Sequence, residues 1–269
     1  MPILKGKQQP ILELIPPGND SQRAVLERIR SREYKPGNLT ITRQGGKFFV
    51  SIAYTFQPQR PTFVPGRVMG IDLGIHYAVV AAWTDSLKRE YWEGSDLRRM
   101  RENLLSRYRE IQKTMTLRDA RRGHGKGYKF KPLHTLRKRW EGYRRWWANR
   151  LANRVVDYAL EGGAEAVALE NLDLRKPTFF TYELKGQTLK FPIGYFLNIL
   201  ESKLRAKGIR VIRVNPAGTT KRCYKCRKEQ DLSLDQREFK CPCGNTCPRD
   251  YNAARNIAQG GLDILRQER

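Results

Sequence analysis

Residues 68–83, VMGIDLGIHYAVVAAW, form the longest apolar run in the chain. The two apolar parts of this run, residues 68–71 and 78–83, predict β-strands that are joined through Gly74. Asp72 lies at the end of the first predicted strand, among apolar neighbours. An ionised carboxylate is costly to bury there without a charge partner. Asp72 is therefore either a turn residue, favoured by the glycine two positions to each side, or part of a functional site.

The rest of the chain predicts an ordered series of elements. Residues 1–66 predict a separate strand-rich unit, with a helix at 20–32 and a β-hairpin at 39–54 that turns at a Gly-Gly pair. The pattern then predicts a third strand at 90–92, a helical hairpin at 97–158, strands at 164–170 and 209–214, and helices at 191–207 and 250–265. Because strands and helices alternate in the second half, we expect a layered α/β domain.

Two further acids could act together with Asp72. Glu170 closes the apolar strand at 164–170, and Asp250 opens the last predicted helix. Each has a local alternative, since a strand-end acid can face water and an aspartate can cap a helix. If the three carboxylates meet at one end of a sheet, they raise one another's pKa unless divalent cations neutralise them. Oxygen ligands suit Mg²⁺ or Mn²⁺, and two such ions support phosphodiester hydrolysis.

The five cysteines all lie between residues 223 and 247. Cys223 and Cys226 have the spacing of a zinc knuckle, in which two thiolates from one tight turn bind the metal. Cys241, Cys243 and Cys247 follow, and one of these three is spare in a four-thiolate site. A local disulfide or free reactive thiols are the alternatives. We expect a structural zinc site, because four thiolates leave no open coordination position.

The charge of the chain points to a polyanionic partner. The formal net charge is +25 and the isoelectric point is near 10.2. Such an excess opposes folding by self-repulsion and is typical of nucleic-acid-binding proteins. The longest apolar run is too short to span a bilayer, and the first ten residues lack an apolar signal core. We therefore expect no membrane association and a cytoplasmic, nucleoid-associated protein.

The predicted helical hairpin at 97–158 holds the densest positive charge in the chain. So many cations with few acids nearby are better explained by phosphates than by a solvated helix surface. The candidate nucleic-acid contacts are Arg118, Arg121, Arg122, Arg137, Arg139, Arg144 and, near the cysteines, Lys221. The hairpin's tryptophans, at 140, 146 and 147, fit a hydrophobic core better, because large aromatic side chains are seldom left outside one.

Several motifs together resemble one known family, the TnpB/OrfB transposon-encoded RNA-guided nucleases, which are relatives of the type V CRISPR effectors. The similarity covers roughly residues 38–258. It is carried by Gly-Ile-Asp72-Leu-Gly, Ala-Leu-Glu170-Asn-Leu, Val-Asn-Pro-Ala-Gly-Thr-Thr-Lys-Arg-Cys223, the cysteine segment and Arg-Asp250-Tyr-Asn-Ala-Ala-Arg-Asn-Ile.

The resemblance implies an RNase H-like (RuvC) nuclease domain in which Asp72, Glu170 and Asp250 bind catalytic Mg²⁺. It also implies that the basic hairpin lies beside a heteroduplex of guide RNA and target DNA. The family's zinc ribbon matches Cys223, Cys226, Cys241 and Cys243, which leaves Cys247 as the extra thiol. The expected division is a partial wedge-like β-rich segment at 1–66, a first nuclease part at 67–218, a zinc ribbon at 219–247 and a last nuclease part at 248–269.

The chain departs from the family pattern before Asp72. Family members usually carry a longer N-terminal region that holds most of the wedge domain and a helical recognition module. A second protein subunit could supply this module. We expect an Mg²⁺-dependent DNA endonuclease that is RNA-guided and transposon- or CRISPR-associated. The alternative is a nucleic-acid-binding subunit with weak or no cleavage, although a pure binder needs no acid cluster facing phosphates.

Overall fold

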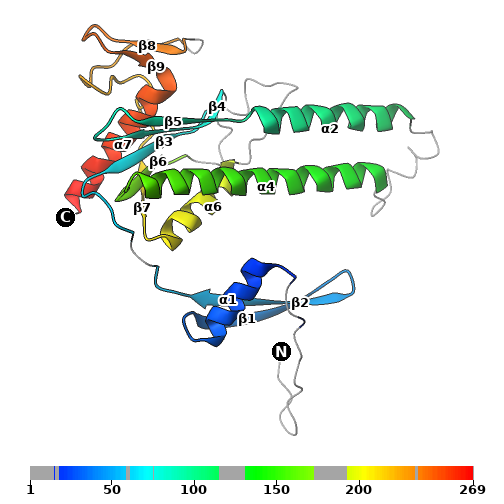
Figure 1. The fold of residues 1–269 in the computed structure, drawn as a ribbon. Helices are drawn as coiled ribbons and strands as arrows, with labels where there is room; N and C mark the ends of the chain where they lie inside the picture. The colour runs from blue at the N-terminus through cyan, green and yellow to red at the C-terminus, as the bar shows by residue number, and fades with distance from the viewer. Residues whose placement is uncertain are drawn as a thin grey trace. The chain divides into compact units, whose positions relative to one another are not determined.

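The computed structural model describes residue 15 and residues 18–58, 61–74, 76–114, 131–172, 193–233 and 236–268. The chain divides into two compact units, Met1–Pro58 and Gln59–Arg269. Figure 1 shows the helices and strands of each unit.

The described residues of the first unit form one helix and one β-hairpin, as the sequence predicts. Its elements are α1 (Asp20–Arg30), β1 (Lys35–Gln44) and β2 (Lys47–Thr55). The Asn19 side chain caps α1 by accepting a hydrogen bond from the Ser21 N–H, at 2.8 Å. Gly45 and Gly46 turn the antiparallel hairpin with φ values of +56° and +80°. Glycine suits this turn because other residues are strained at positive φ.

The second unit is built around a five-stranded mixed sheet. Its strands are β3 (Val68–Asp72), β4 (Tyr77–Trp83), β5 (Arg89–Glu93), β6 (Ala166–Glu170) and β7 (Arg210–Val214). Their order is β5-β4-β3-β6-β7. The first three strands form the predicted antiparallel meander, whereas β6 pairs parallel with both β3 and β7. The three parallel strands therefore end at the same edge of the sheet.

Helices cover both faces of this sheet and make a three-layered α/β domain. On one face, Met69 and Ile71 of β3 join a core with α4 (Lys131–Glu161) and α6 (Ile193–Ala206). On the other face, Val68 joins a core with α7 (Arg249–Gln267). The alternation follows from the two-residue period of a strand. Figure 1 shows α7 running across the strands on the side opposite α4.

Small residues allow α7 to pack very close to the sheet. A Cβ atom added to Gly70 of β3 would lie 2.1 Å from the carbonyl oxygen of Ala254 in α7. One added to Gly261 of α7 would lie 2.5 Å from the Cβ of Ala168 in β6. Any side chain at these glycines would push the helix away from the strands. The beginning of α7 is thereby fixed with respect to β3 and β6.

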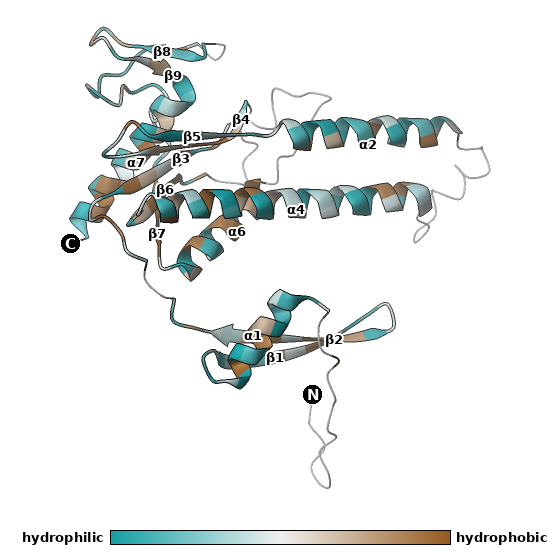
Figure 2. Ribbon diagram, viewed as in Figure 1, coloured by the Kyte–Doolittle hydropathy of each residue, from teal (hydrophilic) through white to brown (hydrophobic). Residues whose placement is uncertain are grey.

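The predicted helical hairpin corresponds to α2 (Ser95–Thr114) and α4, with residues 115–130 between them outside the described part. Figure 2 shows that α2 is mostly hydrophilic along its length. The tryptophan prediction is right only in part. Trp147 is buried in the core, but Trp146 is 50% exposed. Successive residues of a helix point about 100° apart, so adjacent tryptophans on α4 face different surroundings.

A small two-stranded sheet, β8 (Glu238–Lys240) and β9 (Thr246–Pro248), precedes α7. Phe239 of β8 packs with Tyr251 of α7 and the buried cysteines. Within the described residues, no helix is long and apolar enough to cross a membrane.

Candidate functional site

Asp72 and Glu170 lie on the same face and at the same edge of the central sheet. Asp72 shares its face of β3 with Val68 and Gly70, which contact α7, because side chains two residues apart point the same way. In β6, Glu170 shares the face of Ala168, which also packs against α7. The two strands are parallel neighbours whose last paired positions, Ile71 and Leu169, directly precede the two acids.

Asp250 reaches this edge from the first turn of α7. Its Oδ2 atom would lie 3.9 Å from a Cβ added to Gly74, two residues beyond Asp72. The helix-capping alternative for Asp250 is wrong, since the N-cap position is Pro248 and makes no side-chain capping hydrogen bond. Asp250 instead follows Arg249, the first helical residue. The structure thus brings an acid from β3, an acid from β6 and an acid from α7 to one edge.

The electrostatics of Asp72 reflect this crowding. Burial raises the pKa of its carboxyl group well above the usual value, and the charges of Glu170 and Asp250 raise it further. The positive charge of Arg249 and a hydrogen bond from the backbone N–H of Leu73 act in the opposite direction but do not cancel the effect. Without a cation, an ionised Asp72 is therefore unfavourable in the folded protein.

Glu170 is held by contacts that the sequence did not reveal. Its Oε1 atom accepts a hydrogen bond of 2.6 Å from the Thr219 hydroxyl group. Burial raises the pKa of the Glu170 carboxyl group, and this hydrogen bond lowers it in part. The carbonyl oxygen of Glu170 accepts a hydrogen bond of 3.0 Å from Arg213 of β7. Thr219 belongs to a motif that the sequence singled out, yet only the folded loop shows what its side chain contacts.

The donor set fits divalent cations such as Mg²⁺ or Mn²⁺. Three carboxylates supply hard oxygen ligands, and their mutual repulsion would be relieved by added positive charge. Among the described residues, the close group of potential ligand atoms is formed by cysteines, so the carboxylates are spaced more widely.

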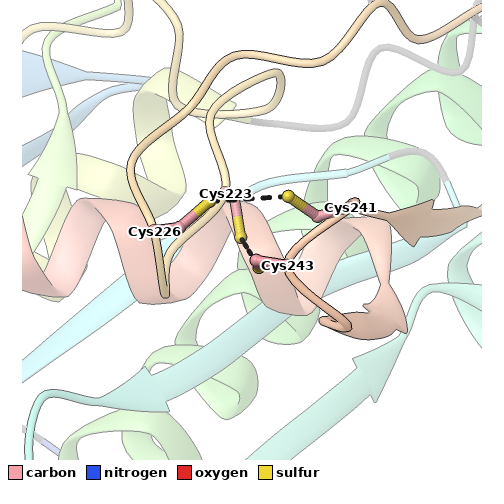
Figure 3. Close-up of side chains that lie close together, drawn as sticks. All are labelled: Cys223, Cys226, Cys241 and Cys243. Atoms are coloured by element: carbon pink, nitrogen blue, oxygen red, sulfur yellow. Dashed lines mark hydrogen bonds between the residues drawn. The ribbon is translucent and has the colours of Figure 1, made fainter.

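Four cysteines form a second candidate metal centre. The ligand atoms of Cys223, Cys226, Cys241 and Cys243 all lie within 4.8 Å of one another. Figure 3 shows their side chains converging from two loops. The Sγ–Sγ distance is 3.7 Å between Cys223 and Cys243 and 3.5 Å between Cys226 and Cys241. A tetrahedral zinc ion with Zn–S bonds of about 2.3 Å requires sulfur atoms about 3.8 Å apart, so the group can hold zinc.

The fifth cysteine, Cys247, lies outside this group of four. It is buried on β9, where the Asn245 side-chain amide is 3.8 Å from its Sγ atom. The same amide lies 3.4 Å from the Sγ atom of Cys223. Burial acts to raise the pKa of Cys223, but hydrogen bonds from the backbone N–H groups of Cys226 and Lys225 and from Asn245 lower it to about 7. A thiol with a lowered pKa ionises more readily than an ordinary thiol.

The candidate nucleic-acid contacts fall into three groups. Arg118, Arg121 and Arg122 lie outside the described residues. Arg137 and Arg139 on α4 and Lys221 beside the cysteine cluster are exposed, and Arg137 pairs with Glu141 at 3.1 Å. Arg144 is different, because it is partly buried and its guanidinium group lies 5.8 Å from the centre of the Trp140 ring. Burial lowers the pKa of the Arg144 guanidinium group.

Comparisons of the sequence with protein families and with curated proteins find matches of the same kind. Residues 194–257 match the family model described as Cas12f1-like, TNB domain. The chain is 28% identical to the CRISPR-associated endodeoxyribonuclease Cas12f1 of Syntrophomonas palmitatica, with 93% of this chain and 58% of the relative covered. It is 29% identical to the Cas12f1 protein of Sulfoacidibacillus thermotolerans, with 90% and 58% covered. The chain thus spans little more than half the length of the curated relatives that it matches.

Solved structures show the same fold. The cryo-EM structure of a Cas12f1–sgRNA–target DNA complex matches with a TM-score of 0.69 at 24% identity, over 87% of this chain and 48% of that chain. A CRISPR–Cas12f ternary complex matches with a TM-score of 0.64 at 24% identity, over 89% and 48%. The chain is thus similar to Cas12f1 proteins in sequence and to Cas12f complexes in fold.

Proposed function

We propose that this chain carries the nuclease centre of an RNA-guided DNA endonuclease. In this proposal Asp72, Glu170 and Asp250 bind two Mg²⁺ or Mn²⁺ ions in an RNase H-like (RuvC) domain. The observation that carries the proposal is the meeting of these three acids, from two parallel strands and one helix, at a single sheet edge. The matched relatives are named CRISPR-associated endodeoxyribonucleases, and one similar structure contains guide RNA and target DNA.

The chain's own residues would act by binding and orientation. Bound ions of this kind supply a lowered pKa for water and a positive charge beside the leaving oxygen. Asp72 and Asp250 would fix the ions from β3 and α7, and Glu170 would do so from β6 while Thr219 restrains it. Hydrolysis adds water to the phosphorus atom and breaks the bond to one sugar oxygen. The exposed arginines of α4 would hold the polyanionic backbone.

The cysteine group would hold one zinc ion with a structural role. Four thiolates leave no open position for a substrate. The group lies directly before α7 in sequence, and its buried members pack with Tyr251, the residue after Asp250. Zinc binding would therefore order the segment that leads into Asp250. A cytoplasmic, nucleoid-associated location and a second subunit that contributes a recognition module complete the proposal.

The proposal can be tested with the protein purified together with the RNA that it binds. Sequencing this RNA would identify a guide, and a DNA carrying the matching sequence would serve as substrate with Mg²⁺ or with EDTA. Asp72→Ala and Asp250→Ala should abolish cleavage while RNA and DNA binding persist. Asp263→Ala is the matched control, since Asp263 is an exposed acid on the same helix as Asp250. Failure of the wild-type protein to cut either single- or double-stranded DNA would support the binding-subunit alternative.

A further inference from the structure

We propose that Thr219 is a positioning residue for Glu170, and that helix α7 sets this contact as well as supplying Asp250. The proposal rests on the proposed function of Glu170 as a metal ligand. It assigns a role to the loop that connects β7 to the cysteine group, which the two candidate metal centres leave unexplained.

The contact between Thr219 and Glu170 has the properties of an orienting hydrogen bond. Thr219 is 7% exposed, and its hydroxyl group lies 2.6 Å from the Oε1 atom of Glu170. The hydroxyl group has one proton, and the other acceptor within reach is the Pro216 carbonyl oxygen at 3.1 Å. The shorter contact to a charged acceptor is favoured. It restrains the rotamer of Glu170, whose carboxylate has a second oxygen that can bind a cation.

The loop that carries Thr219 is held by two asparagines of α7. The side-chain amide of Asn256 donates to the carbonyl oxygens of Thr219, at 2.8 Å, and Arg222, at 2.6 Å. The side-chain amide of Asn252 donates to the same Arg222 oxygen at 2.7 Å, and its own oxygen accepts from the Tyr224 N–H at 3.1 Å. Both asparagines are buried. Because they lie one helical turn apart, they form a single clamp on the loop.

This clamp couples the positions of two carboxylates, those of Glu170 and Asp250. Asp250 lies two residues before Asn252 on the same helix, so one rigid element carries an acid and fixes the partner of another acid. The same loop continues into Cys223, whose neighbour Tyr224 is bonded by Asn252. The relative positions of Glu170 and Asp250 therefore depend on α7 rather than on the strand ends alone.

The alternative is that Thr219 only stabilises its own turn. Its backbone N–H lies 3.4 Å from the Pro216 carbonyl oxygen, so a turn contact exists independently of Glu170. The two roles are separable by side-chain chemistry. Valine has nearly the shape of threonine without the hydroxyl group, whereas serine keeps the hydroxyl group. A positioning role predicts that serine rescues function and that valine does not.

The test measures Mn²⁺ binding by isothermal titration calorimetry on the wild-type protein and on Thr219→Val, Thr219→Ser and Asp72→Ala. Mutation of a residue that orients a metal ligand typically lowers metal affinity by roughly 10- to 100-fold. We expect Thr219→Val to weaken Mn²⁺ binding by at least about 10-fold and to slow cleavage, whereas Thr219→Ser should stay within about 3-fold of wild type. Thermal unfolding in EDTA should be similar for all three Thr219 forms, and Thr219→Ala provides a second variant without the hydroxyl group.

Three results would overturn the inference in distinguishable ways. If wild type binds Mn²⁺ in a manner that Asp72→Ala abolishes, yet Thr219→Val binds it equally well, the positioning role is wrong and the proposed function stands. If wild-type binding is no stronger than that of Asp72→Ala, the proposed metal centre itself fails and the inference falls with it. Equal loss of stability in EDTA for the valine and serine variants, with Mn²⁺ affinity unchanged, would assign Thr219 to the turn alone.

Discussion

Replacing Gly70 by alanine should damage both the stability of the protein and its metal centre. Gly70 lies on β3, two residues before Asp72, at the point where α7 crosses the strand. The added Cβ atom would lie 2.1 Å from the Ala254 carbonyl oxygen and 2.3 Å from the Ala258 nitrogen. Both of these neighbours are backbone atoms of a buried helix, so they cannot turn away as a flexible side chain would.

The size of the effect follows from these distances. Ordinary van der Waals contact to a Cβ atom begins at 3.4 Å, so the helix and the strand must separate by about 1 Å. Overpacking of this kind costs about 1–3 kcal/mol of unfolding free energy. For a chain of this size the melting temperature should fall by roughly 2–12 °C. A displacement of about 1 Å between catalytic groups can also slow a reaction by about 100-fold.

The assay combines thermal unfolding in EDTA, Mn²⁺ titration and Mg²⁺-dependent DNA cleavage by the RNA-bound protein. Gly142→Ala is the matched control, because Gly142 lies inside α4 and a Cβ atom there meets nothing within 4 Å. This control should gain about 1 kcal/mol of stability through higher helix propensity, with cleavage unchanged. If Gly70→Ala melts and binds Mn²⁺ as wild type does, the close approach of α7 to β3 does not set the site.

Three further predictions concern charge and metal. Because the pKa of Asp72 is raised in the folded protein, its contribution favours folding at low pH and is lost as the pH rises through that pKa. Asp72→Asn should therefore stabilise the metal-free protein more at pH 8 than at pH 5, since each pH unit between 5 and the folded-state pKa adds about 1.4 kcal/mol to the difference, and an equal stability difference between variant and wild type at both pH values would refute this. Elemental analysis should find about one zinc per chain, and Cys226→Ser should remove it and weaken Mn²⁺ binding at the carboxylates; retained zinc would exclude the four-cysteine site. Arg139→Glu should make the slope of log affinity against log salt concentration shallower by about one to two, in measurements of nucleic-acid binding. Arg144→Gln, at a partly buried position, should change this slope less.

The sequence predicted the elements of the second unit because their apolar patterns are strong. The strands around Asp72 and before Glu170 are almost wholly buried, so each of them is a short run of apolar residues and glycine. The parallel pairing of β3 with β6 could not be seen in either strand alone. It follows only when α4, which precedes β6 in the chain, is found packed against the sheet, so that β6 enters beside β3.

The acids of the candidate site could be predicted from the sequence, but the residues that hold them in place could not. Asp72 and Glu170 stand out because a charge at the end of an apolar strand is costly. Thr219 carries no such signal, since its role depends on a loop whose position is fixed by hydrogen bonds from α7. Trp146 was misjudged for a related reason. Its neighbour Trp147 is in the core. When two adjacent residues of a helix are both aromatic, the sequence does not indicate which one faces the core.

The packing of α7 across the sheet has a consequence for how the protein folds. The side chain of Arg255 on this helix bonds the carbonyl oxygen of Trp83, which is 172 residues away in the sequence. Contacts of such long range form slowly, because the loop between them must close before the contact is gained. We therefore expect the three acids to come together late in folding, so that a partly folded chain lacks an intact cation site. Divalent cations should accordingly slow unfolding of the finished domain while leaving its folding rate nearly unchanged.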